Sequence, residues 1–368
     1  MIYGVREAAW PAIRTDLGLS YLEIGWILTI PGIVSMVLEP AIGLAGDTRH
    51  RRLLVGAGGI VVAATLVLAG TAPAFAVFLA AECLMAPASG AFVSLSQASL
   101  MDLAPRDREP NMARWMVAGS IGNVAGPLLL AAAIAAALDW RDLFLALALV
   151  TVPLAVAGWW AHVPAPGAVE AHEAHRPRPS ALLAAVRDRE VLRWLVALEA
   201  GDLLGDVLMG FLALYLVDVA GASGGIGGIA VAAWSAAGLV GGAALVRLTR
   251  RIDGAWYLRV SAAASLVLFP AFLLVQGPAA KIASVFVLGV VTAGWYPIAQ
   301  ARLFGVLEGR SGLAVAVASL TAPLGVIPPL VIGAVATAAD LQTALWLLLG
   351  GPLLLLWVVP THARAPDR

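Results

Sequence analysis

Long apolar segments dominate this chain of 368 residues and exclude most soluble folds. A helix needs about 20 mostly apolar residues to cross the hydrocarbon core of a membrane. Eleven stretches of that length, each bounded by charges or by Gly and Pro, run over about 22–46, 53–72, 75–99, 113–137, 142–163, 191–217, 225–246, 255–275, 279–304, 313–337 and 341–360. Because barrel strands would alternate polar and apolar residues over about 10 positions, these segments predict an all-α membrane protein.

The composition supports a chain surrounded by a lipid bilayer. Hydrophobic residues make up 61% and charged residues 12%, where about 25% charged is usual in soluble domains. The formal net charge of zero argues against a nucleic-acid partner. Cys83 is the sole cysteine, so an intramolecular disulfide and a cysteine metal cluster are excluded.

The longest polar interruption, 164–190, is predicted to be a linker between two helical halves, 1–163 and 191–368. The linker contains His172 and His175, but its composition is typical of a solvated loop, and we expect no metal site there.

The arginines of the chain concentrate in the loops on one side of the predicted bundle, including the linker. The opposite side holds only Arg14, Arg141 and Lys281. Since positively charged loops stay in the cytoplasm, the linker and the carboxyl terminus are predicted to be cytoplasmic, with the chain in the plasma (inner) membrane.

Two landmarks indicate an internal repeat. The segment GLAGDTRHRR from Gly43 is similar to GAALVRLTRR from Gly242, 199 residues later, and Pro127 and Pro328 stand 201 residues apart. Duplicated halves of six helices each would produce this offset. The offset also predicts that the first helix is truncated at the amino terminus, which leaves about 11–12 transmembrane helices. A start codon assigned too far downstream, a fragment and a re-entrant first segment all remain open as explanations.

The segment GLAGDTRHRR resembles the signature between the second and third helices of the major facilitator superfamily (MFS), although a threonine and a histidine replace a basic residue and a glycine. The resemblance implies an MFS-type bundle in which this cluster gates the cytoplasmic face. Gly43 would allow close helix packing, Asp47 would cap a helix, and Arg51 and Arg52 would bind anionic headgroups. The alternative is a positively charged loop without a gating role.

A glycine-rich helix resembles the MFS motif that ends in Gly-Pro and is associated with antiporters. Here it consists of Gly119, Gly122, Gly126 and Pro127. The resemblance favours export, and ordinary helix packing is the alternative.

Three carboxylates interrupt an apolar segment. Glu199, Asp202 and Asp206 have the spacing i, i+3 and i+7, which places them on one face of a helix. Charges at this depth in a membrane are costly and mark functional sites, so this face is predicted to couple transport to protons or to bind a cation. Salt bridges to other helices are the alternative.

Other charged residues in apolar segments complete the predicted cavity. Arg6 and Glu7 lie on the helix related by the repeat to the acidic one, so Arg6 would pair with an acid of the other half, bind an anionic substrate or lie at the membrane interface. Glu39 is a candidate for the cavity or for a gate. Glu82 stands where MFS proteins often have an arginine, so the role of that arginine is not carried over.

Polar and aromatic side chains are expected to line the cavity as well. These are Gln97, Trp295, Tyr296, Gln300 and Arg302. Such a lining suits amphiphilic ligands.

The sequence contains no phosphate-binding GxxxxGK[ST], no metal-binding His/Glu box and no nucleophile elbow. We therefore expect neither an enzyme nor a cofactor. The leading hypothesis is a proton-coupled antiporter that exports a small organic molecule by alternating access. The alternatives are a proton-coupled symporter for an anionic metabolite, with Arg6 and Arg302 as its anion contacts, and a non-transporting, sensor-like or truncated inactive homologue.

Overall fold

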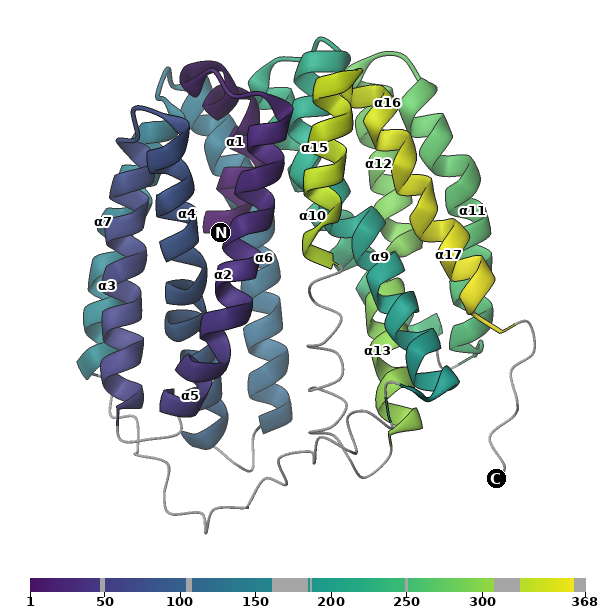
Figure 1. The fold of residues 1–368 in the computed structure, drawn as a ribbon, viewed down its shortest axis with the longest axis horizontal. Helices are drawn as coiled ribbons and strands as arrows, with labels where there is room; N and C mark the ends of the chain where they lie inside the picture. The colour runs from purple at the N-terminus through teal and green to yellow at the C-terminus, as the bar shows by residue number, and fades with distance from the viewer. Residues whose placement is uncertain are drawn as a thin grey trace.

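The computed structural model describes residues 1–46, 50–103, 108–160, 185, 187–248, 251–307 and 325–360. All regular elements in these ranges are helical (Figure 1). The first group comprises α1 (Ile2–Leu17), α2 (Tyr21–Gly46), α3 (Arg51–Gly70), α4 (Phe75–Ser89), the π-helical η1 (Gly90–Ser94), α5 (Leu95–Leu103), α6 (Arg108–Ala135) and α7 (Trp140–Trp160). The second comprises α9 (Arg189–Leu214), the π-helical η3 (Tyr215–Val219), α10 (Gly224–Leu248), α11 (Gly254–Leu274), α12 (Pro278–Thr292), α13 (Trp295–Val306), α15 (Pro328–Ala338), α16 (Leu341–Leu345), the 3₁₀-helical η4 (Trp346–Leu349) and α17 (Gly350–Val358).

The predicted membrane spans are confirmed wherever the structure describes them. Ten helical runs among the described residues are long and apolar enough to cross a membrane, and each matches a predicted segment to within a few residues. The remaining predicted segment, 313–337, is described from residue 325 onward and contains the short helix α15. The fold class predicted from the sequence, an all-α membrane bundle, is therefore correct.

The first helix, α1, ends in a left-handed turn. Its 16 residues are followed by the C-cap residue Gly18, whose φ of 62° lies in the left-handed region that glycine adopts without strain. The N–H group of Gly18 donates to the carbonyl of Arg14, which closes the last turn before α2 begins.

The helices form two groups that stand side by side (Figure 1). The main contacts between the groups join α1 to α9 and α10, α2 to α15, and α6 to α10. The predicted division at 163 and 190 stays a prediction, because most of the linker lies outside the described residues.

Helix α9 is central to the second group, where it packs against α10, α13 and α17 as well as against α1. Its first turn is capped by Asp188, whose side chain accepts a hydrogen bond of 2.8 Å from the N–H group of Glu190. The residues that it buries are apolar, and Glu199, Asp202 and Asp206 share one face of the helix.

Candidate functional site

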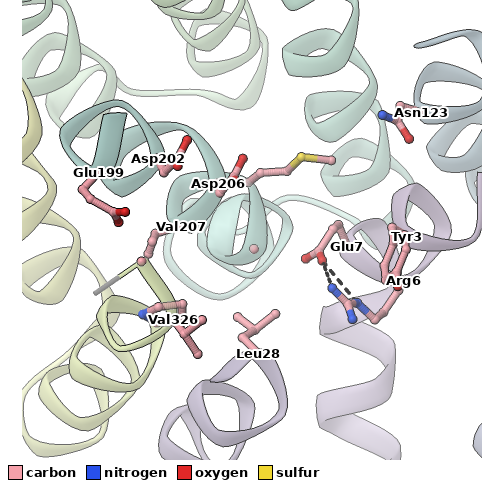
Figure 2. A pocket seen from close by; sticks show the side chains of 14 residues that line it. Tyr3, Arg6, Glu7, Leu28, Asn123, Glu199, Asp202, Asp206, Val207 and Val326 are labelled. Atoms are coloured by element: carbon pink, nitrogen blue, oxygen red, sulfur yellow. Dashed lines mark hydrogen bonds and ion pairs between the residues drawn. The ribbon is translucent and has the colours of Figure 1, made fainter. Parts of the chain in front are cut away.

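A cavity of about 570 Å³ lies between the two groups of helices. Its walls come from α1, α2, α6 and α9 and from the chain around the start of α15. Figure 2 shows the acidic side chains of α9 on one side of the cavity and Arg6 and Glu7 of α1 on another. A volume of this size is typical of sites that bind a small molecule.

The three carboxylates predicted to share one helix face all line this cavity. Glu199, Asp202 and Asp206 follow one another along α9, over about 10 Å at 1.5 Å per residue. Glu199 lies against the chain before α15, since a Cβ added to Gly325 would stand 2.9 Å from its Oε2 atom. Asp202 and Asp206 form no hydrogen bond or ion pair with any residue that the structure describes. Two acidic groups are thus available to a ligand or a proton.

Arg6 forms a compact charge cluster on the opposite wall. Its Nη1 donates to Oε2 of Glu82 in α4 at 2.6 Å, and its Nε donates to Oε1 of Glu7 at 3.2 Å. Glu7 in turn accepts a hydrogen bond of 2.8 Å from Nε1 of Trp10. The guanidinium also lies 5.1 Å from the ring centroid of Tyr3. Arg6 therefore pairs within its own group, and the prediction of a partner among the acids of the other half is not met.

Glu82 is a buried partner of Arg6 to which the sequence analysis assigned no role. Its side chain is 1% exposed, and its Oε1 atom is buried without a hydrogen-bond partner among the described residues. A glutamate in the apolar segment 75–99 and an arginine on the first helix were the signal that a pair could form. Because Arg6 and Glu82 are 76 positions apart, the sequence does not show that they pair.

The two groups are joined at the end of the bundle where α1 passes into α2. Asp218, in η3, accepts hydrogen bonds from Nη1 of Arg14 at 3.0 Å and from the hydroxyl of Tyr21 at 2.9 Å. Nearby, the N–H group of Leu22 donates to the hydroxyl of Thr337 at 2.9 Å. We call the group formed by Arg14, Tyr21 and Asp218 the end latch. It joins the two groups of helices at this end of the bundle.

The predicted gate motif makes contacts with helix ends. Nε of the buried Arg51 donates to the carbonyl of Gly46, the last residue of α2, at 2.7 Å. Nε of Arg52 donates to the carbonyl of Trp159 near the end of α7. A Cβ at Gly43 would meet nothing within 4 Å, so close packing does not require glycine there. Asp47 lies outside the described residues, so its proposed capping role stays a prediction.

The glycine-rich motif of α6 faces α1. A Cβ at Gly126 would stand 2.5 Å from the carbonyl oxygen of Met1, and one at Gly122 would stand 3.1 Å from the amino nitrogen of Met1. Pro127 lies in the same helix and touches Gly4. Gly119 has open space around it. The motif thus positions the helix that carries Arg6.

The remaining predicted site residues are dispersed. Trp295 is buried and donates to the hydroxyl of Ser261 at 2.8 Å, whereas Tyr296 is 49% exposed and accepts a hydrogen bond of 3.2 Å from Gln300. Arg302 pairs with Asp253 at the start of α11. That pairing places its charge at a helix cap and not on the cavity wall.

Two predicted polar residues of the first group lie near η1. The carboxylate of the exposed Glu39 would be 3.1 Å from a Cβ at Gly90, the first residue of η1. Gln97 follows in α5. π-Helical turns often occur at functional sites, and neither residue is among those that line the cavity.

Comparison with known proteins assigns a family and a fold. The sequence model described as Major Facilitator Superfamily matches residues 3–299. A crystal structure of the nucleoside transporter NupG superposes with a TM-score of 0.77 at 14% identity, and the match covers 97% of this chain and 94% of that one. A bacterial homologue of the human lysosomal transporter Spinster, in an inward-facing and occupied conformation, superposes with a TM-score of 0.74 at 13% identity over 96% of this chain and 89% of that one. At these identities the likeness shows the fold alone. No curated protein matches the sequence.

Proposed function

The chain belongs to the major facilitator superfamily, and from that premise we propose that it is a proton-coupled antiporter that exports a small organic molecule. The cavity between the halves would bind the molecule, and rocking of the halves would expose it to each side of the membrane in turn. The observation that carries the proposal is the acidic face of α9, where Asp202 and Asp206 line the cavity without partners among the described residues.

Exchange of a proton for a substrate needs an acidic group that both can reach. A carboxylate that binds either a proton or a ligand makes the two compete, which is the basis of antiport. Asp202 and Asp206 meet this requirement because they lie on the cavity wall and are not committed to an ion pair. Glu7 and Glu82 do not meet it, because both are paired with Arg6.

The end latch supports alternating access. Arg14 and Tyr21 of the first group contact Asp218 of the second through exposed or half-exposed polar groups. Such contacts are individually weak, so they break at a small cost in free energy when the halves rock.

Reconstitution into liposomes tests the proposed direction of coupling. Compounds from a metabolite and drug panel that raise the melting temperature of the purified protein would be added outside vesicles that contain a fluorescent pH indicator. Antiport predicts that each transported compound makes the vesicle interior more alkaline as protons leave. Acidification of the interior would instead establish symport.

Substitutions on α9 test the assignment of the proton site. We expect Asp202→Asn combined with Asp206→Asn to abolish compound-driven proton movement while the protein still elutes as a single folded species. Glu190→Gln is the matched control, because Glu190 lies on the same helix, is exposed and is outside the cavity. Proton movement that survives the double substitution would remove the coupling role from these residues.

Uptake of an anionic metabolite is less well supported by the site. Both arginines that would contact an anion are paired, Arg6 with Glu7 and Glu82, and Arg302 with Asp253. The vesicle assay separates the two functions by the sign of the pH change.

A further inference from the structure

A second hollow, of about 180 Å³, opens beside the central cavity and shares Asp202 and Asp206 with it. Trp234 of α10 and Tyr296 of α13 provide its aromatic walls, and Gly205 of α9 and Gly238 of α10 also line it. We call the hollow formed by Asp202, Gly205, Asp206, Trp234, Gly238 and Tyr296 the aromatic recess. Whole ligands usually occupy pockets of about 300–1,000 Å³, so the recess has room for a single functional group.

The rings of Trp234 and Tyr296 are accessible to a ligand, whereas the neighbouring Trp295 is buried. Tyr296 is 49% exposed, and its hydroxyl group accepts a hydrogen bond from Gln300, which leaves the ring face to a ligand. Trp234 is partly buried and held in place, since a Cβ at Gly289 would stand 3.2 Å from its ring. Trp295 is 2% exposed, and its N–H group donates a hydrogen bond to the hydroxyl of Ser261. Trp234 and Tyr296 can therefore contact a ligand, while Trp295 supports the wall.

The glycines keep the recess open without being required by helix packing. A Cβ added at Gly205 or at Gly238 would meet nothing within 4 Å. By contrast, a Cβ at Gly241, in the same helix α10, would stand 2.5 Å from the side chain of Ala293. Glycine inside a helix lowers helix stability relative to alanine, so these two glycines do not serve the helix itself. What they provide is open space beside the carboxylates.

The charge around the recess favours a cation. Asp202 and Asp206 have no counter-ion among the described residues. Arg6, the cation on the wall of the central cavity, pairs with two carboxylates, those of Glu7 and Glu82. Oε1 of Glu82 is buried and has no hydrogen-bond partner among the described residues. Aromatic faces attract cations through their quadrupole, most strongly where water is excluded.

We propose that the aromatic recess binds the positively charged head group of an organic ammonium compound, while the rest of the molecule lies in the central cavity. The proposal rests on the proposed transport function, because it names the class of substrate for the same cavity. Two carboxylates and two aromatic rings around one small hollow bind a substituted ammonium group by charge and by cation–π contact at once.

Three compounds of closely matched shape test the proposal by isothermal titration calorimetry on the full chain in lipid nanodiscs. Choline carries a trimethylammonium group, 3,3-dimethylbutan-1-ol replaces its nitrogen with carbon, and 3,3-dimethylbutanoate carries a negative charge. We expect choline to bind at least about tenfold more tightly than either of the others, because only choline gains the carboxylate and cation–π contacts. Equal affinity for all three would overturn the proposal.

Variants of the recess test where the head group binds. We expect Trp234→Leu and Tyr296→Leu each to weaken choline binding about tenfold, whereas Tyr296→Phe keeps the ring and retains the affinity. Gly205→Ala with Gly238→Ala should also weaken binding by filling the hollow. Gly242→Ala is the matched control, since position 242 lies on α10 in equally open space but outside the recess. Choline affinity that is the same in the double variant and in this control would overturn the proposal.

The binding assay in nanodiscs and the transport assay in vesicles together separate failure of the recess from failure of the antiport proposal. If choline shows no preference while panel compounds still drive proton movement that depends on Asp202 and Asp206, the recess assignment is wrong and antiport stands. If choline binds as expected but no compound moves protons in the vesicles, the recess stands and the coupling proposal fails.

Discussion

The two walls of the central cavity hold buried charge in opposite ways. On the α1 side, Arg6, Glu7 and Glu82 form a closed cluster in which the cation is held by two carboxylates. On the α9 side, Asp202 and Asp206 face the cavity and have no ion pair among the described residues. A charge inside a membrane protein must be paired or must reach a wet space. One wall therefore uses its charges for structure, and the other keeps them available for chemistry.

The largest expected effect comes from breaking the paired wall. Arg6→Gln leaves two buried carboxylates without their cation, which should lower the free energy of unfolding by about 3–5 kcal/mol. Adding Glu82→Gln should recover part of that loss, because one unpaired charge is removed. Unfolding of the purified variants in mixed detergent micelles measures both effects. Arg251→Gln, at an exposed turn, is the control, and a loss in Arg6→Gln no larger than in this control would contradict the pairing.

An intermediate effect is expected at the end latch. Asp218→Asn weakens the contacts with Arg14 and Tyr21, which are only half-buried, so the loss should be about 1 kcal/mol or less. The measurable consequence is more frequent opening of this end of the cavity. In a Cys83→Ser background, a cysteine introduced at Leu28 on the cavity wall should react faster with a membrane-impermeant maleimide when the latch is weakened. An unchanged labelling rate would show that the latch does not control access.

A smaller effect is expected from an ionic contact outside the membrane spans. Partial burial raises the pKa of Asp253, but hydrogen bonds from the N–H groups of Trp256 and Ala255 and the nearby Arg302 guanidinium lower it, with a net downward shift. A depressed pKa means that Asp253 stabilises the folded state above its unfolded pKa of about 4, and that this contribution is lost as the pH falls further. The melting temperature should therefore drop below about pH 4 more steeply in the wild type than in Asp253→Asn. Parallel curves would contradict this assignment.

The smallest effect on stability is expected where the effect on transport is largest. Asp202→Asn with Asp206→Asn breaks no ion pair that the structure describes, so the free energy of unfolding should change by no more than about 0.5 kcal/mol. The unfolding assay used for Arg6→Gln measures this directly. A loss comparable to that of Arg6→Gln would mean that the charges of both walls stabilise the fold.

Much of the fold was predictable because its determinants are local in sequence. The length of each apolar stretch sets a membrane span, and the spacing of Glu199, Asp202 and Asp206 places them on one helix face in any α-helix. Those predictions agree with the helices that the structure describes. Contacts between helices were less predictable. Arg51 and Arg52, for which lipid headgroups are the predicted ligands, each also donate to a carbonyl group near a helix end, and the sequence did not indicate these contacts.

The sequence by itself determined that the chain is a helical membrane bundle with an acidic face on one helix, because both properties follow from periodicity within a single segment. Only the tertiary structure decided that Arg6 is held by Glu82, that Asp218 joins the two halves, and that Trp234 and Tyr296 flank Asp202 and Asp206. These arrangements join residues on different helices. Lateral packing and rotation of the helices set such pairings, and no spacing along the chain encodes them.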